Sequence, residues 1–198
     1  MNNCYLDAEA VITFFRITGR KHIFITGSRG SGKSYLVNNM LKHMSDSFNL
    51  LQSHRTDTPQ VVIKSNLVAD NKEFVIGLPR TSGINPASKG NNMTINESGF
   101  INCAIPAIDT HLDTTPEKLF VIDELGYLES SCISFQKAVE KLLDNSHVLA
   151  VIRKQSTEFL NRICNRRDVL VIDIDKTFET LSCIIMASGM SKRFGSNK

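Results

Sequence analysis

The stretch that most constrains this chain is G-S-R-G-S-G-K-S at residues 27–34, which fits the pattern G-x-x-x-x-G-K-[ST] at every fixed position. The apolar run His22–Thr26 leads into it, and Tyr35–Met44 follows with apolar residues at helical spacing. Strand, glycine-rich loop and helix N-terminus together offer a cradle of backbone N–H groups to an anion. The residues expected to hold phosphate are Gly27, Ser28, Arg29, Gly30, Ser31, Gly32, Lys33, Ser34 and Tyr35.

Two side chains of this loop have specific expected roles. Lys33 would reach the β- and γ-phosphates of a nucleoside triphosphate, and the Ser34 hydroxyl would bind Mg²⁺. The alternative is a plain glycine-rich turn before a helix. The agreement of both flanks and of all four fixed positions argues against that alternative.

Two acidic residues, Asp123 and Glu124, follow the apolar run Leu119–Ile122, which has the composition of a strand buried on both faces. In open parallel sheets, ligands bind at the carboxyl ends of strands. Facing a phosphate loop, an Asp at this place holds Mg²⁺, and the neighbouring Glu can orient or deprotonate an attacking water. The alternative is an acidic strand end that caps the next turn.

Glu129 offers a further carboxylate a few residues on. It can join Ser34 and Asp123 around the Mg²⁺, or it can be a helix-start acid that interacts with the helix dipole. The sequence leaves both possibilities open.

Basic residues gather after the next expected strand, His147–Ile152. Arg153 and Lys154 fall at its carboxyl end, on the side of the phosphate loop, and Arg153 is the candidate for a cation that neutralises charge developing on a γ-phosphate. Arg166 and Arg167 fall in a helix-to-strand turn, which places them at the opposite edge of the sheet as surface residues.

Strands and helices alternate along the chain, which predicts an α/β fold with a mostly parallel central sheet and right-handed crossovers. Besides those named above, we expect a strand at Val169–Ile174 and helices at Leu6–Thr18, Phe135–Leu143 and Ser156–Cys164. Residue Ser156 or Thr157 is the expected cap of the last helix.

The segment after the expected strand Asn49–His54 departs from this alternation. Two β-rich runs between Gln60 and Leu78 flank the polar cluster Asp70-Asn71-Lys72, which predicts an inserted β-hairpin. Pro79–Ser98 is rich in Gly, Asn, Ser and Pro and is predicted to be a loop, either a plain surface loop or a lid over the nucleotide.

Composition limits the remaining function classes. The net charge of +3 gives no reason to expect nucleic acid as a main partner. Five scattered cysteines without a C-x-x-C pair argue against a disulfide framework or a structural zinc site, and so favour a reducing cytoplasm. No run is long enough to span a bilayer, and we expect no membrane partner.

The segment Ile122–Glu129 resembles the D-E-[IL]-G-x-x-E segment of the small P-loop nucleoside-triphosphatases related to a thermophilic archaeal and bacterial enzyme, and Ile23–Leu36 is similar to the phosphate loop of that family. The resemblance covers about residues 21–175. It implies a three-layer sandwich related to nucleotide kinases and Mg²⁺-dependent hydrolysis of ATP, GTP or other nucleoside triphosphates. It also implies that Asp123 serves the metal and Glu124 the water.

The chain departs from this family in two places. The helix Leu6–Thr18 is additional, and Asp175–Glu179 stands where the family carries an Asn-Arg element after its last strand. Contacts to the base that depend on that element are therefore not implied for this chain.

The tail carries a second resemblance. Residues 183–198 resemble the opening of molybdenum-cofactor cytidylyl- and guanylyltransferases, a strand followed by G-x-S-x-R-[FM]-G-x-x-K. Together the two resemblances imply an N-terminal helix at 1–20, an NTPase domain at 21–178, and a linker with the truncated start of a nucleotidyltransferase domain at 179–198. Either the full-length protein carries the rest of that domain after this segment, or the tail is a relic of one. A basic Gly/Ser tail is the alternative. The matching residues are Gly189, Ser191, Arg193, Gly195 and Lys198.

Three functions fit these observations. The first is a Mg²⁺-dependent nucleoside-triphosphatase with Lys33, Glu124 and Arg153 as catalytic residues. The second is a kinase that passes the γ-phosphate to a nucleotide or small molecule. The third is a nucleotide-binding regulatory module attached to a nucleotidyltransferase, against which Glu124 argues because a pure binding module has no use for it.

Overall fold

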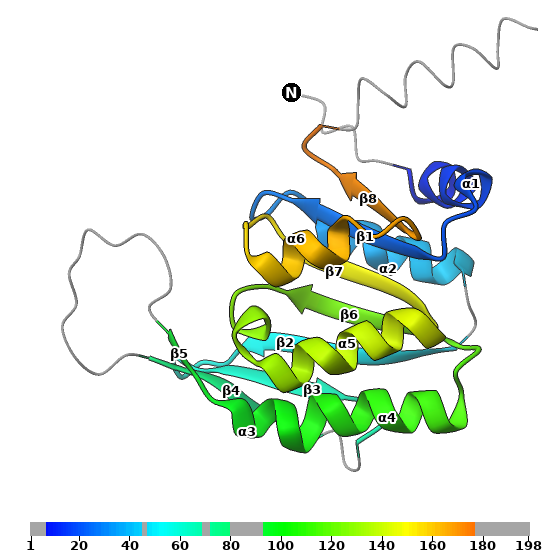
Figure 1. Cartoon of the computed structure of the whole chain (residues 1–198). Helices are drawn as coiled ribbons and strands as arrows, with labels where there is room; N and C mark the ends of the chain where they lie inside the picture. Colours follow the sequence, from blue (N-terminus) through cyan, green and yellow to red (C-terminus); the bar gives the residue numbers. More distant parts are fainter. Residues whose placement is uncertain (1–6, 45–46, 69–71, 80–92, 177–198) are drawn as a thin grey trace, which may run out of the picture.

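The computed structural model describes residues 7–44, 47–68, 72–79 and 93–176. These residues form an eight-stranded sheet in the order β5-β4-β3-β2-β6-β7-β1-β8, which Figure 1 shows as the central layer. The strands are β1 (His22–Gly27), β2 (Phe48–Arg55), β3 (Val61–Ser65), β4 (Phe74–Pro79), β5 (Met93–Ile95), β6 (Leu119–Leu125), β7 (His147–Arg153) and β8 (Val169–Asp173).

The sheet has a parallel half and an antiparallel half. Strands β2, β6, β7, β1 and β8 run parallel to one another. Strands β3, β4 and β5 continue from β2 as an antiparallel meander. The predicted hairpin is confirmed as β3 and β4, and the mostly parallel sheet is confirmed with it.

One prediction for the antiparallel half is wrong in part. Residues 93–95 of the predicted loop Pro79–Ser98 form β5, and a helix begins at Glu97. The free edge of β4 pairs with β5, and the Met93 side chain is buried there, so polar composition is overridden by edge pairing. Residues 80–92 lie outside the described residues.

Helices cover both faces of the sheet, which confirms the three-layer α/β sandwich. Figure 1 shows α4, α5 and α6 on one face and α2 on the other, with α1 beside α2. Thr157 is the N-cap of α6, as one of the two expected caps. The helices named here are α1 (Ala8–Thr18), α2 (Lys33–Met44), α4 (Ile105–Thr114), α5 (Ile133–Asn145) and α6 (Glu158–Cys164).

A continuous helical stretch at residues 97–114 was not expected from the sequence. It consists of α3 (Glu97–Gly99), a π-helical turn η2 (Phe100–Ala104) and α4. Pro106 lacks an amide hydrogen, and its ring crowds the carbonyl four residues earlier. A π-turn immediately before the proline widens the helix at the place where this crowding arises.

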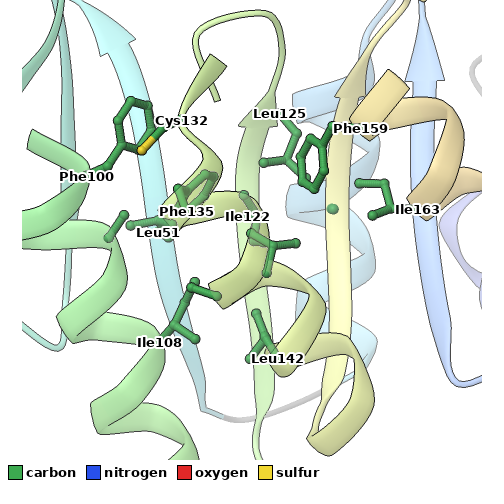
Figure 2. Packing of buried hydrophobic residues seen from close by; sticks show 14 of the residues in the cluster. Leu51, Phe100, Ile108, Ile122, Leu125, Cys132, Phe135, Leu142, Phe159 and Ile163 are labelled. Carbon is green, nitrogen blue, oxygen red and sulfur yellow. The ribbon is translucent and has the colours of Figure 1, made fainter. Parts of the chain in front are cut away.

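Each face of the sheet has its own hydrophobic core. The core under α1 and α2 includes Ile23 and Ile25 of β1, and the core under α4, α5 and α6 includes Phe24. Alternate residues of β1 thus enter different cores, as expected for a strand buried on both faces. Figure 2 shows the larger core, where Phe135 and Leu142 of α5 point toward Ile122 of β6.

Candidate active site

The loop 27–34 connects β1 to α2, as predicted. Gly30 has φ 76° and Gly32 has φ 93°, conformations that only glycine adopts without strain. Helix α2 begins at Lys33, so its free N–H groups lie at the end of the loop. The geometry is that of an anion cradle at the N-terminus of a twelve-residue helix.

The Lys33 ammonium lies over the loop in this structure. Its Nζ donates to the carbonyl oxygens of Gly27 at 2.9 Å and Ser28 at 2.8 Å. Ser34 and Tyr35 are exposed beside it, so both side chains can reach a ligand in the cradle. These bonds give the ammonium a resting place at the loop, and phosphate oxygens can take the place of the carbonyls.

The predicted acids lie at the end of β6. Asp123 is half-buried, and burial raises its pKa, while a long 3.5 Å bond from Gln52 Nε2 and the nearby Lys33 charge oppose this rise. The register with β7 shifts between Asp123 and Leu125, so Glu124 falls outside the regular ladder. Glu124 accepts a 2.7 Å bond from Arg153 Nε.

Arg153 ends β7 and faces β6, as expected for a residue at a neighbouring strand end. Besides its ion pair with Glu124, its guanidinium carbon lies 6.0 Å from the centre of the Tyr127 ring. The bond to Glu124 uses Nε, which leaves the two terminal nitrogens of the guanidinium to face a phosphate.

Glu129 lies in a single 3₁₀ turn, η3 (Glu129–Ser131), before α5 begins. Its carboxylate is buried and accepts a 2.9 Å bond from the Gly126 amide. Burial raises the pKa of Glu129 to about 7, while hydrogen bonds from its own backbone amide and from the Gly126 amide lower it. The side chain therefore fixes the turn that follows Glu124, and it is not the first-turn acid of α5.

Sequence reasoning missed the turn that follows β8. The Asp175 carboxylate accepts from the Ser28 amide at 2.8 Å and from Lys154 Nζ at 2.9 Å, although the sequence suggested only that this segment departs from the family. The signal that could have found Asp175 is the one that found Asp123. Both lie at the carboxyl ends of parallel strands of the same sheet, where ligands bind.

Most of these groups surround one cleft of about 860 Å³. Asp123 and Asp175 are not among the residues that line it. Arg166, expected at the opposite edge of the sheet, is paired with Asp168 and Asp144 and does not line it either. The cleft continues past Glu124 to the end of β2. Its lining includes Gly27 to Tyr35, Ser53, His54, Arg55, Val61, Glu124, Gly126, Tyr127, Leu128, Glu129, Arg153 and Lys154.

The donors at this edge of the sheet suit Mg²⁺. Ser34 in the cleft offers a hydroxyl, and Asp123 at the end of β6 offers a carboxylate, both hard oxygen ligands. Within the described ranges, no group of three or more His, Cys, Asp or Glu side chains forms a metal cage. Mg²⁺ needs no such cage, because in nucleotide sites it takes one or two protein ligands and completes its shell with phosphate oxygens and water.

A family model described as NTPase matches residues 22–179, which include the phosphate loop, the end of β6 and the turn after β8. The chain belongs to this NTPase family. The nucleoside-triphosphatase THEP1 of Thermotoga sp. strain RQ2 is 26% identical over 156 residues, 78% of this chain and 86% of the relative. The protein of the same name from Thermotoga maritima is 24% identical over 155 residues, with coverage of 78% and 86%.

Solved structures agree on the fold of the NTPase family. The crystal structure of THEP1 from Aquifex aeolicus matches with a TM-score of 0.61 at 18% identity, covering 84% of this chain and 98% of that one. The solution structure of a human cancer-related nucleoside triphosphatase matches with a TM-score of 0.58 at 19% identity, covering 87% and 99%.

The expectation of a P-loop nucleoside-triphosphatase is thus confirmed at the level of the family. The family match ends at residue 179, and the tail 183–198 lies outside the described residues, so its resemblance to a nucleotidyltransferase stays a prediction. In the part of the chain that the structure describes, no helix is long and apolar enough to cross a membrane.

Proposed function

We propose that this chain hydrolyses the terminal phosphate of ATP, GTP or other nucleoside triphosphates with Mg²⁺. The observation that carries the proposal is the arrangement of the cleft, where the Lys33 ammonium at the start of α2 and the Glu124 carboxylate at the end of β6 line the same space. The relatives named nucleoside-triphosphatase support the same activity. A loop that binds phosphate and an acid that activates water are the two parts that such hydrolysis needs.

Each group in the site has a separate role. The amides of the loop 27–34 and Lys33 bind the phosphate chain, and Ser34 and Asp123 hold Mg²⁺, with Glu129 near its water shell. When bound, Mg²⁺ neutralises phosphate charge. Glu124 orients a water and accepts its proton as the water oxygen attacks the γ-phosphorus and the bond to the bridging oxygen breaks.

Arg153 supplies the remaining charge. Its Nε bond to Glu124 keeps the carboxylate in place, and its terminal nitrogens neutralise charge on the γ-phosphate as the bond breaks. One side chain thereby connects the group that activates water to the group that is attacked.

Two substitutions test the proposal. Lys33→Ala should abolish turnover by removing phosphate binding. Glu124→Gln should keep the affinity for a nonhydrolysable triphosphate within about threefold while kcat falls by about 10²–10⁴, the usual contribution of a general base. Calorimetric titration and phosphate-release kinetics give both quantities.

The matched controls change a lysine and a carboxylate that are exposed and do not line the cleft. Lys42→Ala changes an exposed lysine at the far end of α2, and Glu158→Gln changes an exposed carboxylate at the start of α6. Both should turn over like wild type. Equal loss of binding in Lys33→Ala and Glu124→Gln would contradict the role of Glu124 in placing the water.

A kinase is the second candidate, favoured by the reach of the cleft past Glu124 to Ser53, His54 and Arg55. This end of the cleft, at the end of β2, carries an exposed arginine suited to an anionic acceptor. Phosphate release measured without any acceptor decides between the two. Release that persists supports the hydrolase, and release that begins only when a nucleotide or small hydroxyl compound is added supports the kinase.

We also infer that the protein works in a reducing cytoplasm. The described cysteines Cys103, Cys132 and Cys164 are all free thiols. Burial raises the pKa of Cys103 and of Cys164 to about 11, so both behave as small apolar side chains. Fractionation of cells followed by thiol labelling would test this placement.

A further inference from the structure

The turn after β8 is fixed against the phosphate loop by its backbone. The Ile174 amide donates to the Thr26 carbonyl at 2.9 Å, and the Asp175 amide donates to Asp173 Oδ1 at 3.1 Å. The Ile174 side chain is buried in the core under α1 and α2. Asp175 is therefore presented to the loop by a short, anchored segment.

One oxygen of Asp175 gathers three donors. Its Oδ2 accepts from the Ser28 amide at 2.8 Å, from Ser28 Oγ at 2.6 Å and from Lys154 Nζ at 2.9 Å. These bonds, above all the one from the Ser28 hydroxyl, lower the pKa of Asp175 to about 2, so the carboxylate is charged at neutral pH. Charge-assisted bonds of this kind are about twice as strong as neutral ones.

Ser28 passes this restraint on to the catalytic lysine. Its carbonyl oxygen accepts from the Ser31 amide at 3.2 Å, from Ser31 Oγ at 2.7 Å and from Lys33 Nζ at 2.8 Å. Ser28 is thus bonded to Asp175 on its amide side and to Ser31 and Lys33 on its carbonyl side. A shift of Ser28 moves the first turn of the loop and the place where Lys33 rests.

Lys154 is held by the same turn. Its Nζ lies 3.0 Å from Asp173 Oδ2 and 2.9 Å from Asp175 Oδ2, and its side chain lines the cleft. Two carboxylates therefore fix one cation at the rim of the cleft, where a triphosphate carries its negative charge.

We propose that Asp175 is a positioning residue that preforms the phosphate loop through Ser28 and holds Lys154 at the rim for an incoming nucleoside triphosphate. This inference rests on the proposed function, because it assumes that the loop binds phosphate. The charge of Asp175 by itself would repel a triphosphate. Its three partners are all donors, one of them a cation, and the order they impose on the loop outweighs that repulsion.

Two variants separate the parts of this role. Asp175→Ala removes all three bonds and should raise the Kd for Mg²⁺ with a nonhydrolysable ATP analogue about tenfold, the loss expected for charge-assisted hydrogen bonds. Asp175→Asn keeps an oxygen for Ser28 but gives up the ion pair with Lys154, and should raise the Kd about threefold. In both, KM for ATP should rise while kcat stays within about twofold, because Asp175 touches no reacting atom.

Asp109→Ala is the matched control, since Asp109 forms a 2.8 Å exposed ion pair with Lys141 far from the cleft, and its Kd should equal that of wild type. If Asp175→Ala does not fold, Asp175→Asn supplies the measurement. An unchanged or lowered Kd in the variants would overturn the inference. Absence of nucleotide binding by the wild type would instead refute the proposed function on which it rests.

Discussion

The first glycine of the phosphate loop lies at the most crowded position of the site. A Cβ added to Gly27 would lie 2.6 Å from Ile174 Cγ1 and 2.8 Å from Ser31 Oγ. The turn after β8 thus presses against the loop where the chain leaves β1. This contact explains why the loop needs glycine at Gly27 for space as well as for its φ of 157°, while Gly30 and Gly32 are needed for their positive φ alone.

Gly27→Ala should therefore weaken nucleotide binding at least tenfold and lower the free energy of unfolding by about 1–3 kcal/mol, the usual cost of overpacking. Titration with a nonhydrolysable triphosphate and denaturant unfolding measure the two effects. Gly126→Ala is the comparison for stability, because its Cβ would meet no atom closer than 3.4 Å. A Gly27→Ala protein as stable as Gly126→Ala would refute the crowding argument.

At the level of single residues, the sequence predicted the groups that a motif places and missed those that only the fold brings near. Lys33 and Glu124 follow from the loop pattern and from the acids at a strand end. Asp175 has no motif of its own. Its role depends on β8 lying next to β1, which residue spacing does not determine.

Among the elements, those with clear periodicity were predictable. The buried parallel strands and the amphipathic helix α5 have the expected apolar patterns, and their observed limits differ from the predicted ones by a few residues. The helical stretch 97–114 contains Gly99 and Pro106, two residues that break helices in isolation. Packing overrides both. At Gly99 even a methyl group would lie 2.4 Å from the Val75 carbonyl oxygen, so the helix lies directly against β4.

The amino ends of β1 and β7 meet at a buried histidine. The Val148 amide donates to His22 Nδ1 at 3.2 Å, so the proton of the neutral ring is on Nε2, 3.4 Å from Asp168 Oδ2. That approach is too poorly aligned to count as a hydrogen bond. Burial lowers the pKa of His22 to about 4, although Asp168 opposes this effect.

The buried His22 between β1 and β7 predicts that stability depends on pH. Because the pKa of His22 is lower in the folded chain than its ordinary 6.5, the unfolded chain binds more protons between pH 6.5 and about 4. The contribution of His22 to the free energy of unfolding should fall by up to about 3 kcal/mol as the pH drops across this window. The raised pKa of Glu129 acts in the opposite direction between about pH 7 and 4.5, so the His22 contribution is measured as the difference between wild type and a His22 variant. Denaturant titrations at a series of pH values would measure it.

His22→Asn keeps an acceptor for the Val148 amide and cannot titrate, so the fall should be much smaller in this variant. His43→Asn, at an exposed histidine of α2, should behave like wild type. Equal slopes in wild type and His22→Asn would assign the acid sensitivity to other groups.

On the scale of the whole molecule, the site joins the two ends of the described chain. The phosphate loop follows the first strand, and Asp175 follows the last, with Glu124 and Arg153 from the strands between them. A ligand in the cleft therefore contacts the phosphate loop, Glu124 and Arg153, while Asp175 acts on it only through Ser28 and Lys154. These segments separate only when the sheet opens. Nucleotide binding should stabilise the sheet as a unit.

A nonhydrolysable triphosphate with Mg²⁺ at about one hundred times its Kd should stabilise the fold by about 2.7 kcal/mol. For a chain of this size that raises Tm by roughly 5–11 °C, at about 2–4 °C per kcal/mol. Scanning calorimetry with and without the nucleotide would show the shift. Lys33→Ala should show none, and a shift of equal size in that variant would mean that the ligand binds elsewhere.

The position of β1 in the sheet also governs how the chain can be made. In the described sheet, β1 is paired only with β7 and β8, so that Ile23 lies opposite Leu149 and Leu170. During synthesis from the N-terminus, this apolar strand leaves the ribosome long before its partners exist. The residues that β1 pairs with lie more than one hundred positions later in the sequence, so the pairing forms slowly. The strand thus stays exposed until β7 has been synthesised, which makes β1 the natural place for a chaperone to bind.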